Sequence, residues 1–238
     1  MALVPIPRQN RGDADVRNPS AGAAYNRTRG GTRPKRMKRV PDARHYRGYH
    51  DLAREQRRGI DYEISVHSRP ESTIAILAPH GGSIEDGTSE IARAIAAEAF
   101  NLYLLEGRRA SLNYQALHLT SHRFDEPECL QLLAGCRHVV AIHGCDGPDT
   151  TVLLGGLDLV LRDRIAAALS AASVRVSTEG HRFPATHRDN ICNRGASARG
   201  VQLELPHSLR RSGDALLISE VVHAVLLETA CPVAMAGR

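Results

Sequence analysis

The stretch Thr73-Ile-Ala-Ile-Leu-Ala-Pro-His-Gly-Gly-Ser-Ile-Glu-Asp-Gly-Thr88 decides the fold class of this chain. Its apolar, β-branched beginning predicts a buried strand over residues 73–78, and an alanine-rich pattern typical of a helix follows from Ile91 to Phe100. A histidine, two glycines and a carboxylate lie between strand and helix, on a turn at the carboxyl end of the strand. Ligands bind at such turns in open α/β sheets. His80 and Glu85 are therefore candidates to share one metal ion.

The rest of the chain repeats this alternation of short apolar strands and helical segments. We predict further strands at residues 62–68, 101–105, 117–121, 137–143, 151–154, 173–177 and 200–206, and helices at 51–58, 125–135, 159–172 and 215–229. Strands that alternate with helices indicate an α/β fold, with an open, mixed and largely parallel sheet sandwiched by helices. The polar stretch 178–198 is long for a structureless connection, and loops of this length are often functional.

Basic charge is concentrated in the N-terminal part of the chain. Residues 1–48 contain 12 Lys/Arg and three Asp, a net charge of +9, whereas the other 190 residues contain 19 Lys/Arg and 23 Asp/Glu, a net charge of −4. Few large apolar residues occur in residues 1–45, so we predict a disordered basic tail there, followed by one folded domain over 46–238. The cluster Arg33-Pro-Lys-Arg-Met-Lys-Arg39 either attracts a polyanion such as nucleic acid or merely keeps the chain soluble.

The composition argues against a membrane-spanning, a secreted or a disulfide-rich protein. Because no apolar run approaches the roughly 20 residues needed to span a bilayer, no membrane-spanning segment is expected. The first residues lack the pattern of a secretory signal, so we expect a cytoplasmic protein, with release by cell lysis as an alternative. Five scattered cysteines without C-x-x-C spacing indicate free thiols rather than a disulfide framework or a cysteine-rich zinc module: Cys129, Cys136, Cys145, Cys192 and Cys231.

Three predicted strands end in a titratable side chain. The segments Leu-Ala-Pro-His80, Val-Ala-Ile-His143 and Val-Gln-Leu-Glu204 share this pattern, and the carboxyl ends of parallel strands meet at one edge of a sheet. Two imidazoles and a carboxylate with an open position are the ligand set of a catalytic zinc site, which His80, Glu85 and His143 would supply. Glu204 has apolar neighbours that raise the proton affinity of a carboxylate, so it is the candidate general base.

Positively charged side chains on the predicted loops are candidates to contact the substrate. Arg123 or Arg194 would stabilise the oxyanion that develops during hydrolysis. Asn193 together with Arg194 would equally bind a substrate carboxylate, because a guanidinium group matches a carboxylate in a two-point fork.

Each candidate also has a purely structural interpretation. A histidine at a strand end is often only hydrogen-bonded, and Glu204 can pair with an arginine across the sheet. We interpret His118 and His138 as structural residues. The Gly-Gly turn after His80 lacks the lysine that follows a phosphate-binding loop, and Ser121 lies outside any G-x-S-x-G nucleophile elbow.

Six motifs are specific enough to compare with known families: APHGGSIEDGTSEIA (78–92), YLLEG (103–107), LHLTSHRFDEP (117–127), AIHGCDG (141–147), LLGGLD (153–158) and NRGASARGVQLELP (193–206). In this order and spacing they resemble the poly-γ-glutamate hydrolase family, over about residues 50 to 230. That family is a zinc-dependent, carboxypeptidase-like group with an open mixed sheet, first associated with bacteriophages.

The resemblance implies one bound Zn²⁺, with His80, Glu85 and His143 as its ligands and Glu204 as the general base. It also implies cleavage of the γ-glutamyl amide bonds of poly-γ-glutamate. Arg108 and other loop arginines would provide cationic subsites for this polyanion. A zinc deacylase or carboxypeptidase that acts on another acyl-amino acid or γ-linked peptide is the alternative, as is a nucleic-acid-associated protein that acts through its basic tail.

Overall fold

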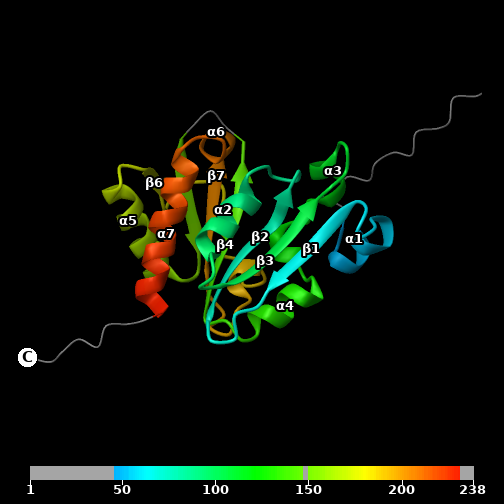
Figure 1. Cartoon of the computed structure of the whole chain (residues 1–238), viewed down its shortest axis with the longest axis horizontal. Helices are drawn as coiled ribbons and strands as arrows, with labels where there is room; N and C mark the ends of the chain where they lie inside the picture. The colour runs from blue at the N-terminus through cyan, green and yellow to red at the C-terminus, as the bar shows by residue number, and fades with distance from the viewer. Residues whose placement is uncertain (1–45, 147–149, 231–238) are drawn as a thin grey trace, which may run out of the picture. The chain divides into compact units, whose positions relative to one another are not determined.

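The computed structural model describes residues 46–146 and 150–230, so the predicted basic tail lies outside the described residues (Figure 1). The described residues form a seven-stranded sheet with the order β1-β3-β2-β4-β7-β5-β6. Its strands are β1 (Tyr62–His67), β2 (Ile74–Gly82), β3 (Asn101–Gly107), β4 (His138–Cys145), β5 (Thr151–Gly156), β6 (Arg175–Ser177) and β7 (Val201–Pro206).

The centre of this sheet is parallel. β2 pairs in parallel with both β3 and β4, and β4 pairs in parallel with β7. β1 runs antiparallel to β3 at one edge, and β5 runs antiparallel to β7 toward the other edge, where β6 lies parallel to β5. The predicted α/β fold with an open, mixed and largely parallel sheet is confirmed. The carboxyl ends of β2, β4 and β7 therefore lie next to one another.

Helices cover both faces of the sheet (Figure 1). The longer ones, α2 (Thr88–Ala96), α5 (Leu159–Ala171) and α7 (Asp214–Ala230), pack on one face. The shorter ones, α1 (Tyr49–Glu55), α3 (Asn113–Leu117) and α4 (Pro127–Leu133), pack on the other. Three single turns complete the described elements, namely η2 (Ser121–Arg123), η3 (Ile191–Asn193) and α6 (His207–Arg210). Within the described ranges, no helix is both long and apolar enough to cross a membrane.

The alternation of side chains along the strands creates two apolar layers. The α7 layer, beneath the longer helices, contains Ile142 and Leu203, and the α4 layer, beneath the shorter helices, contains Ala141. Successive side chains of a strand point to opposite faces. His143 follows Ala141 by two residues, and Glu204 follows Leu203 by one. Both polar side chains are therefore directed to the α4 side of the sheet, beyond the end of its apolar layer.

β2 contains one extra residue just before its carboxyl end. Ala78 pairs with Leu104 of β3, but Gly81 pairs with Glu106, so three steps along β2 match two steps along β3. An extra residue reverses the face toward which the following side chains point, and such irregularities often redirect a functional side chain.

This reversal determines where His80 points. Ala78 belongs to the α7 layer, and in a regular strand the residue two positions later would point the same way. Instead, the His80 ring lies 6.4 Å from the ring of Phe124, which belongs to the α4 layer. His80 thus emerges on the same side of the sheet as His143.

Several short elements differ from the sequence prediction. The predicted strand at 117–121 is wrong, because α3 ends at Leu117 and η2 begins at Ser121. The alternating pattern there arises because Leu117 and Leu119 are buried in the α4 layer, while the residues beside them face the carboxyl edge of the sheet. Alternating burial at residues 117–121 therefore arises from a segment that packs against the sheet, not from a strand within it. The short helices α3 and α6 were also not predicted.

We expect Gly82→Ala to destabilise the fold, because this glycine joins β2 to the turn that carries Glu85. Its φ angle is +59°, and an added Cβ would lie 2.7 Å from the carbonyl oxygen of Gly107. A side chain in this backbone region costs about 1–3 kcal/mol of unfolding free energy. Urea denaturation of the variant measures this loss.

Gly135→Ala is the matched control, because Gly135 has open space around its Cα and no positive φ angle. We expect that variant to unfold within about 1 kcal/mol of the parent. Equal stabilities for the two alanine variants would contradict the geometry assigned to Gly82.

Candidate metal centre

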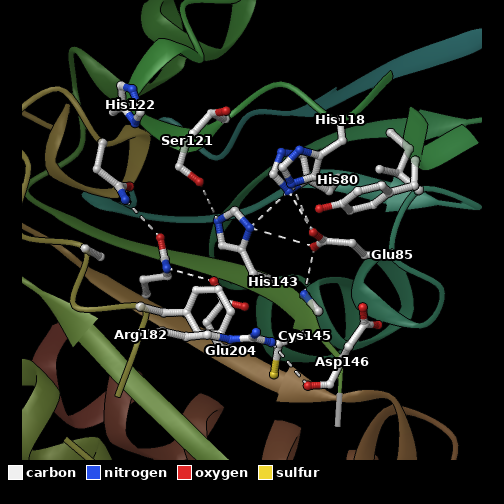
Figure 2. A pocket seen from close by; sticks show the side chains of 18 of the residues that line it. His80, Glu85, His118, Ser121, His122, His143, Cys145, Asp146, Arg182 and Glu204 are labelled. Carbon is white, nitrogen blue, oxygen red and sulfur yellow. Dashed lines mark hydrogen bonds and ion pairs between the residues drawn. The ribbon is translucent and has the colours of Figure 1, made fainter. Parts of the chain in front are cut away.

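His80 and its partners form the centre of the site (Figure 2). The His80 Nε2 atom lies 2.8 Å from the carbonyl oxygen of Leu119. Because a carbonyl oxygen only accepts hydrogen bonds, Nε2 carries the proton. The opposite nitrogen, Nδ1, lies 3.1 Å from Glu85 Oε1 and 3.1 Å from His143 Nδ1. Burial lowers the pKa of His80, but the charge and hydrogen bond of Glu85 outweigh it and raise this pKa. Without an ion, Nδ1 therefore carries a proton that it shares with the carboxylate, and a bound metal ion would replace this proton.

A closed turn brings Glu85 back to His80. The Glu85 amide donates to the His80 carbonyl oxygen at 3.0 Å, and the hydroxyl of Thr88 donates to the carbonyl oxygen of Glu85 at 2.9 Å. The carboxylate is fixed in turn by Gly144, whose amide donates to Oε2 at 2.7 Å. The turn between strand and helix therefore delivers a buried carboxylate to the ends of β2 and β4.

Burial and charge act in opposite directions on these groups. Burial raises the pKa of Glu85, but the charge of His80 and hydrogen bonds from His118 and His80 outweigh it and hold this pKa well below its usual range. Burial, together with the nearby charge of His80, lowers the pKa of His143 to about 3. Glu85 is therefore ionised and His143 neutral at neutral pH, which are the protonation states that metal ligation requires.

The three side chains fit a small cation. Nδ1 or Nε2 atoms of His80 and His143 and a carboxylate oxygen of Glu85 all lie within 4.8 Å of one another, and all three residues are buried. Two imidazole nitrogens that face each other at 3.1 Å beside a carboxylate need a proton or a cation to offset their lone pairs. Two nitrogen ligands and one oxygen ligand suit a transition metal such as Zn²⁺.

Glu204 lies beside this group because β4 and β7 are in register. His143 and Glu204 are direct partners across the parallel pair, so their side chains leave the sheet on the same face. Gln202 donates its Nε2 to Glu204 Oε1 at 2.9 Å, and Asn190 donates its Nδ2 to Gln202 Oε1 at 3.0 Å. Burial, reinforced by the negative charge of Glu85, holds the pKa of Glu204 well above its usual range.

A cavity of about 850 Å³ opens over these groups. Two arginines line it together with the metal-ligand candidates and Glu204. Arg182 donates its Nη2 to the carbonyl oxygen of Asp146 at 3.3 Å and lies over the ring of Phe183 (Figure 2). Arg210 donates to the carbonyl oxygens of Asp86 and Leu205 at 2.7 and 2.5 Å.

The arginines proposed from the sequence lie elsewhere. Arg123 does not line the cavity, and its Nη1 donates to the carbonyl oxygen of Tyr46 at 3.2 Å. Arg108 follows β3 near the β1 edge of the sheet, and its Nη1 lies 3.5 Å from Glu63 Oε2. Arg194 is exposed and is also absent from the cavity lining. Arg123, Arg108 and Arg194 thus lie outside the cavity lining, and their roles toward the substrate stay predictions.

Asn193 is also placed differently from the sequence proposal. Its Oδ1 accepts from the amides of Leu157 and Gly200 at 3.2 and 3.0 Å. Its Nδ2 donates to the carbonyl oxygens of Ala185 and His187 at 2.8 and 3.0 Å. Both ends of the buried amide are thus engaged in holding the loop, and Asn193 does not line the cavity.

The two cysteines near the site differ in their surroundings. Cys145 lines the cavity at the end of β4, and burial raises the pKa of its thiol to about 11. Cys192 is fully buried in the α4 layer, where burial raises the pKa of its thiol well above the usual value. Neither thiol is ionised at neutral pH, so neither is an activated nucleophile.

Sequence reasoning missed four residues of the cavity. Arg182 lies within the polar stretch 178–198, whose length indicated a functional loop. No sequence pattern distinguished Arg182 from the other residues of that stretch. Gln202 precedes Glu204 by two residues and therefore shares its face of β7, which strand periodicity predicts. His118 lies in the segment 117–121, which was wrongly predicted as a strand, and Arg210 lies on α6, which was not predicted.

The comparisons with known proteins agree with this arrangement. The family model described as poly-gamma-glutamate hydrolase matches residues 46–213. The SPbeta prophage-derived UPF0714 protein YoqZ of Bacillus subtilis (strain 168) is 34% identical over 168 residues, which are 70% of this chain and 60% of that protein. The UPF0714 protein YmaC of the same organism is 34% identical over 169 residues, which are 70% of this chain and 71% of that protein.

Two solved structures are similar over most of the described residues. A bacteriophage poly-gamma-glutamate hydrolase has a TM-score of 0.73 and 31% identity, and the match covers 77% of this chain and 97% of that one. The zinc-free apo form of YndL has a TM-score of 0.71 and 26% identity, and the match covers 77% of this chain and 98% of that one. The sequence motifs, the family model and these structures agree: the chain belongs to the poly-γ-glutamate hydrolase family.

Proposed function

We propose that this protein is a zinc-dependent amidohydrolase that cleaves the γ-glutamyl amide bonds of poly-γ-glutamate. The observation that carries the proposal is the buried set of His80, Glu85 and His143 beside the protonatable carboxylate of Glu204, all in one cavity. Membership of the family supplies the substrate class. The similarity to YndL, whose apo form is described as zinc-free, favours zinc as the ion.

The ligand candidates have the atoms and the charge that bind a cation. His80 and His143 turn their Nδ1 atoms toward one point, and Glu85 supplies a negative charge that offsets one of the two charges of the ion. The ion would take the place of the proton on His80. When bound, zinc acts as a Lewis acid that polarises a carbonyl group and lowers the pKa of water to about 7.

Glu204 is the group that moves protons. Amide hydrolysis needs a base to take a proton from water and an acid to deliver a proton to the departing nitrogen. A carboxyl group with a raised pKa does both, because it accepts a proton readily and releases it again. Gln202 holds Oε1 at 2.9 Å, which leaves Oε2 as the oxygen that carries the proton.

Arg182 is the side chain best placed to recognise the polymer. Every residue of poly-γ-glutamate keeps a free α-carboxylate, because its backbone runs through the γ-carboxyl group. Arg182 is exposed on the cavity wall, where a guanidinium group can bind such a carboxylate at two points. Arg210 has two of its donors on backbone carbonyls and mainly adds positive charge to the site.

Incubation with purified poly-γ-glutamate tests the proposed function. The polymer should become shorter on a sizing column, the reaction should stop after treatment with a chelator, and added Zn²⁺ should restore it. Poly-α-glutamate, which has the same charge per residue, is the control and should stay intact. An unchanged poly-γ-glutamate length with zinc-loaded protein would refute the proposal.

Glu204→Gln should lower the rate of polymer cleavage by about 10²–10⁴-fold, the contribution typical of a positioned acid–base group. Glutamine keeps the oxygen that accepts from Gln202 but carries no proton to transfer. Elemental analysis should find the same zinc content as in the parent. A variant with parental activity would remove Glu204 from the mechanism.

The same substitution should stabilise the metal-free protein at neutral pH. Because the pKa of Glu204 is raised on folding, the folded chain binds this proton more tightly than the unfolded chain does. Stability therefore falls as the pH rises above the ordinary glutamate value of 4.5. Thermal melts of chelator-treated parent and Glu204→Gln should differ at pH 7, and the difference should shrink as the pH approaches 4.5.

Arg182→Ala should lower kcat/KM for poly-γ-glutamate by about tenfold, mainly through a higher KM, because a charged contact to the substrate is lost. Arg188→Ala is the matched control: Arg188 is exposed on the same loop, but it does not line the cavity. Steady-state kinetics at low ionic strength should separate the two variants. Equal losses would indicate only a general effect of loop charge.

A further inference from the structure

One short segment, residues 118–121, contacts all three of the metal-ligand candidates (Figure 2). We infer that this segment orients the whole ligand set, with His118 and Ser121 acting as positioning residues for the bound ion. The inference rests on the proposed function, because it concerns the metal centre proposed there. It is carried by three separate contacts, one to each ligand.

The contact to His80 is made by the backbone. The carbonyl oxygen of Leu119 accepts the Nε2 proton of His80 at 2.8 Å, which fixes both the tautomer and the angle of the ring. The Leu119 side chain is 1% exposed and belongs to the α4 layer. Packing of this side chain therefore sets the position of the carbonyl group that selects Nδ1 of His80 as the ligand atom.

The contact to His143 is made by a hydroxyl group. Ser121 Oγ lies 3.5 Å from His143 Nε2, on the side of the ring opposite the nitrogen that faces His80. With Nδ1 directed at the ligand set, Nε2 carries the proton and donates to Ser121. Histidine ligands commonly donate their second nitrogen in this way, and the partner determines the tautomer and raises the basicity of the ligand.

The contact to Glu85 is made by a third imidazole. His118 Nε2 lies 3.5 Å from Glu85 Oε1. The His118 ring is held between two others, with its centroid 4.0 Å from that of His80 and 4.4 Å from that of Tyr114. Among the residues that the structure describes, none is a hydrogen-bond partner for its buried Nδ1, so the Glu85 carboxylate is the polar contact that orients the ring.

The sequence explains why one segment reaches three ligands. Leu117, Leu119 and Phe124 are each 1% exposed and anchor the segment in the α4 layer. Between these anchors, His118 and Ser121 remain at the cavity wall. The buried leucines thus hold His118, the Leu119 carbonyl group and Ser121 against the carboxyl edge of the sheet. The ligand atoms are oriented before any ion arrives, which is what gives a metal site high affinity.

Two matched pairs of variants test the inference. Ser121→Ala removes the hydroxyl group, whereas Ser121→Thr keeps it. His118→Phe keeps a flat ring between Tyr114 and His80 but has no donor for Glu85, whereas His118→Gln keeps a side-chain N–H donor. The affinity for Zn²⁺ is measured by competition with a chromogenic chelator, and the geometry of the site by the visible spectrum of the Co²⁺-loaded protein.

Ser121→Ala and His118→Phe should each weaken zinc binding by about 10–100-fold and change the Co²⁺ spectrum, as loss of a partner to a metal ligand typically does. Ser121→Thr and His118→Gln should recover most of the affinity. Circular dichroism checks that each variant folds. If His118→Phe does not fold, the comparison of Ser121→Ala with Ser121→Thr tests the inference alone. Ser121→Ala removes only one oxygen atom from the cavity wall, so it should fold.

The outcomes separate this inference from the proposed function. Parental zinc affinity and an unchanged Co²⁺ spectrum in both Ser121→Ala and His118→Phe would overturn the positioning roles, while a parent protein that binds zinc and shortens the polymer would keep the proposed function intact. A parent protein that binds no zinc would overturn both.

Discussion

The site depends on a single extra residue in β2. Without the irregularity between Ala78 and Gly81, His80 would point into the apolar α7 layer, where an imidazole would have no partner. The extra residue turns the ring to the other side of the sheet, toward His143. Gly82, two residues after His80, has a φ angle of +59°, and the turn that follows brings Glu85 back to the same point. The extra residue and the turn after it thus position two of the three ligand candidates.

Two buried carboxylates in this cavity have opposite pKa shifts. Glu85 is surrounded by imidazoles and a backbone amide, which keep its pKa low. Glu204 lies on the next strand but one from β2, among fewer donors, and burial together with the charge of Glu85 raises its pKa. Groups whose environments separate their pKa values usually take different chemical roles. This difference supports the proposal that Glu85 holds the cation and Glu204 transfers the proton.

The sequence was most informative where a residue belongs to a strand. His80, His143 and Glu204 were predicted to converge because parallel strands must bring their carboxyl ends together, and the register of β4 and β7 confirms this for the last two. Arg123 ends the short turn η2 and Arg194 follows η3, and sequence periodicity does not predict the path of such connections. Asn193 looked like a recognition residue, yet its amide is engaged by the backbone of its own loop and of its neighbours. Such contacts between distant segments leave no local pattern.

The separation of the ligands along the chain has a consequence for the stability of the protein. His80 and His143 are 63 residues apart, so an unfolded chain does not hold them together. An ion that binds only the folded state shifts the folding equilibrium toward it, by about 2.7 kcal/mol when its free concentration is 100 times the dissociation constant. With the proposed ion at this site, its supply in the surroundings would therefore also set how much of the protein survives unfolding and proteolysis.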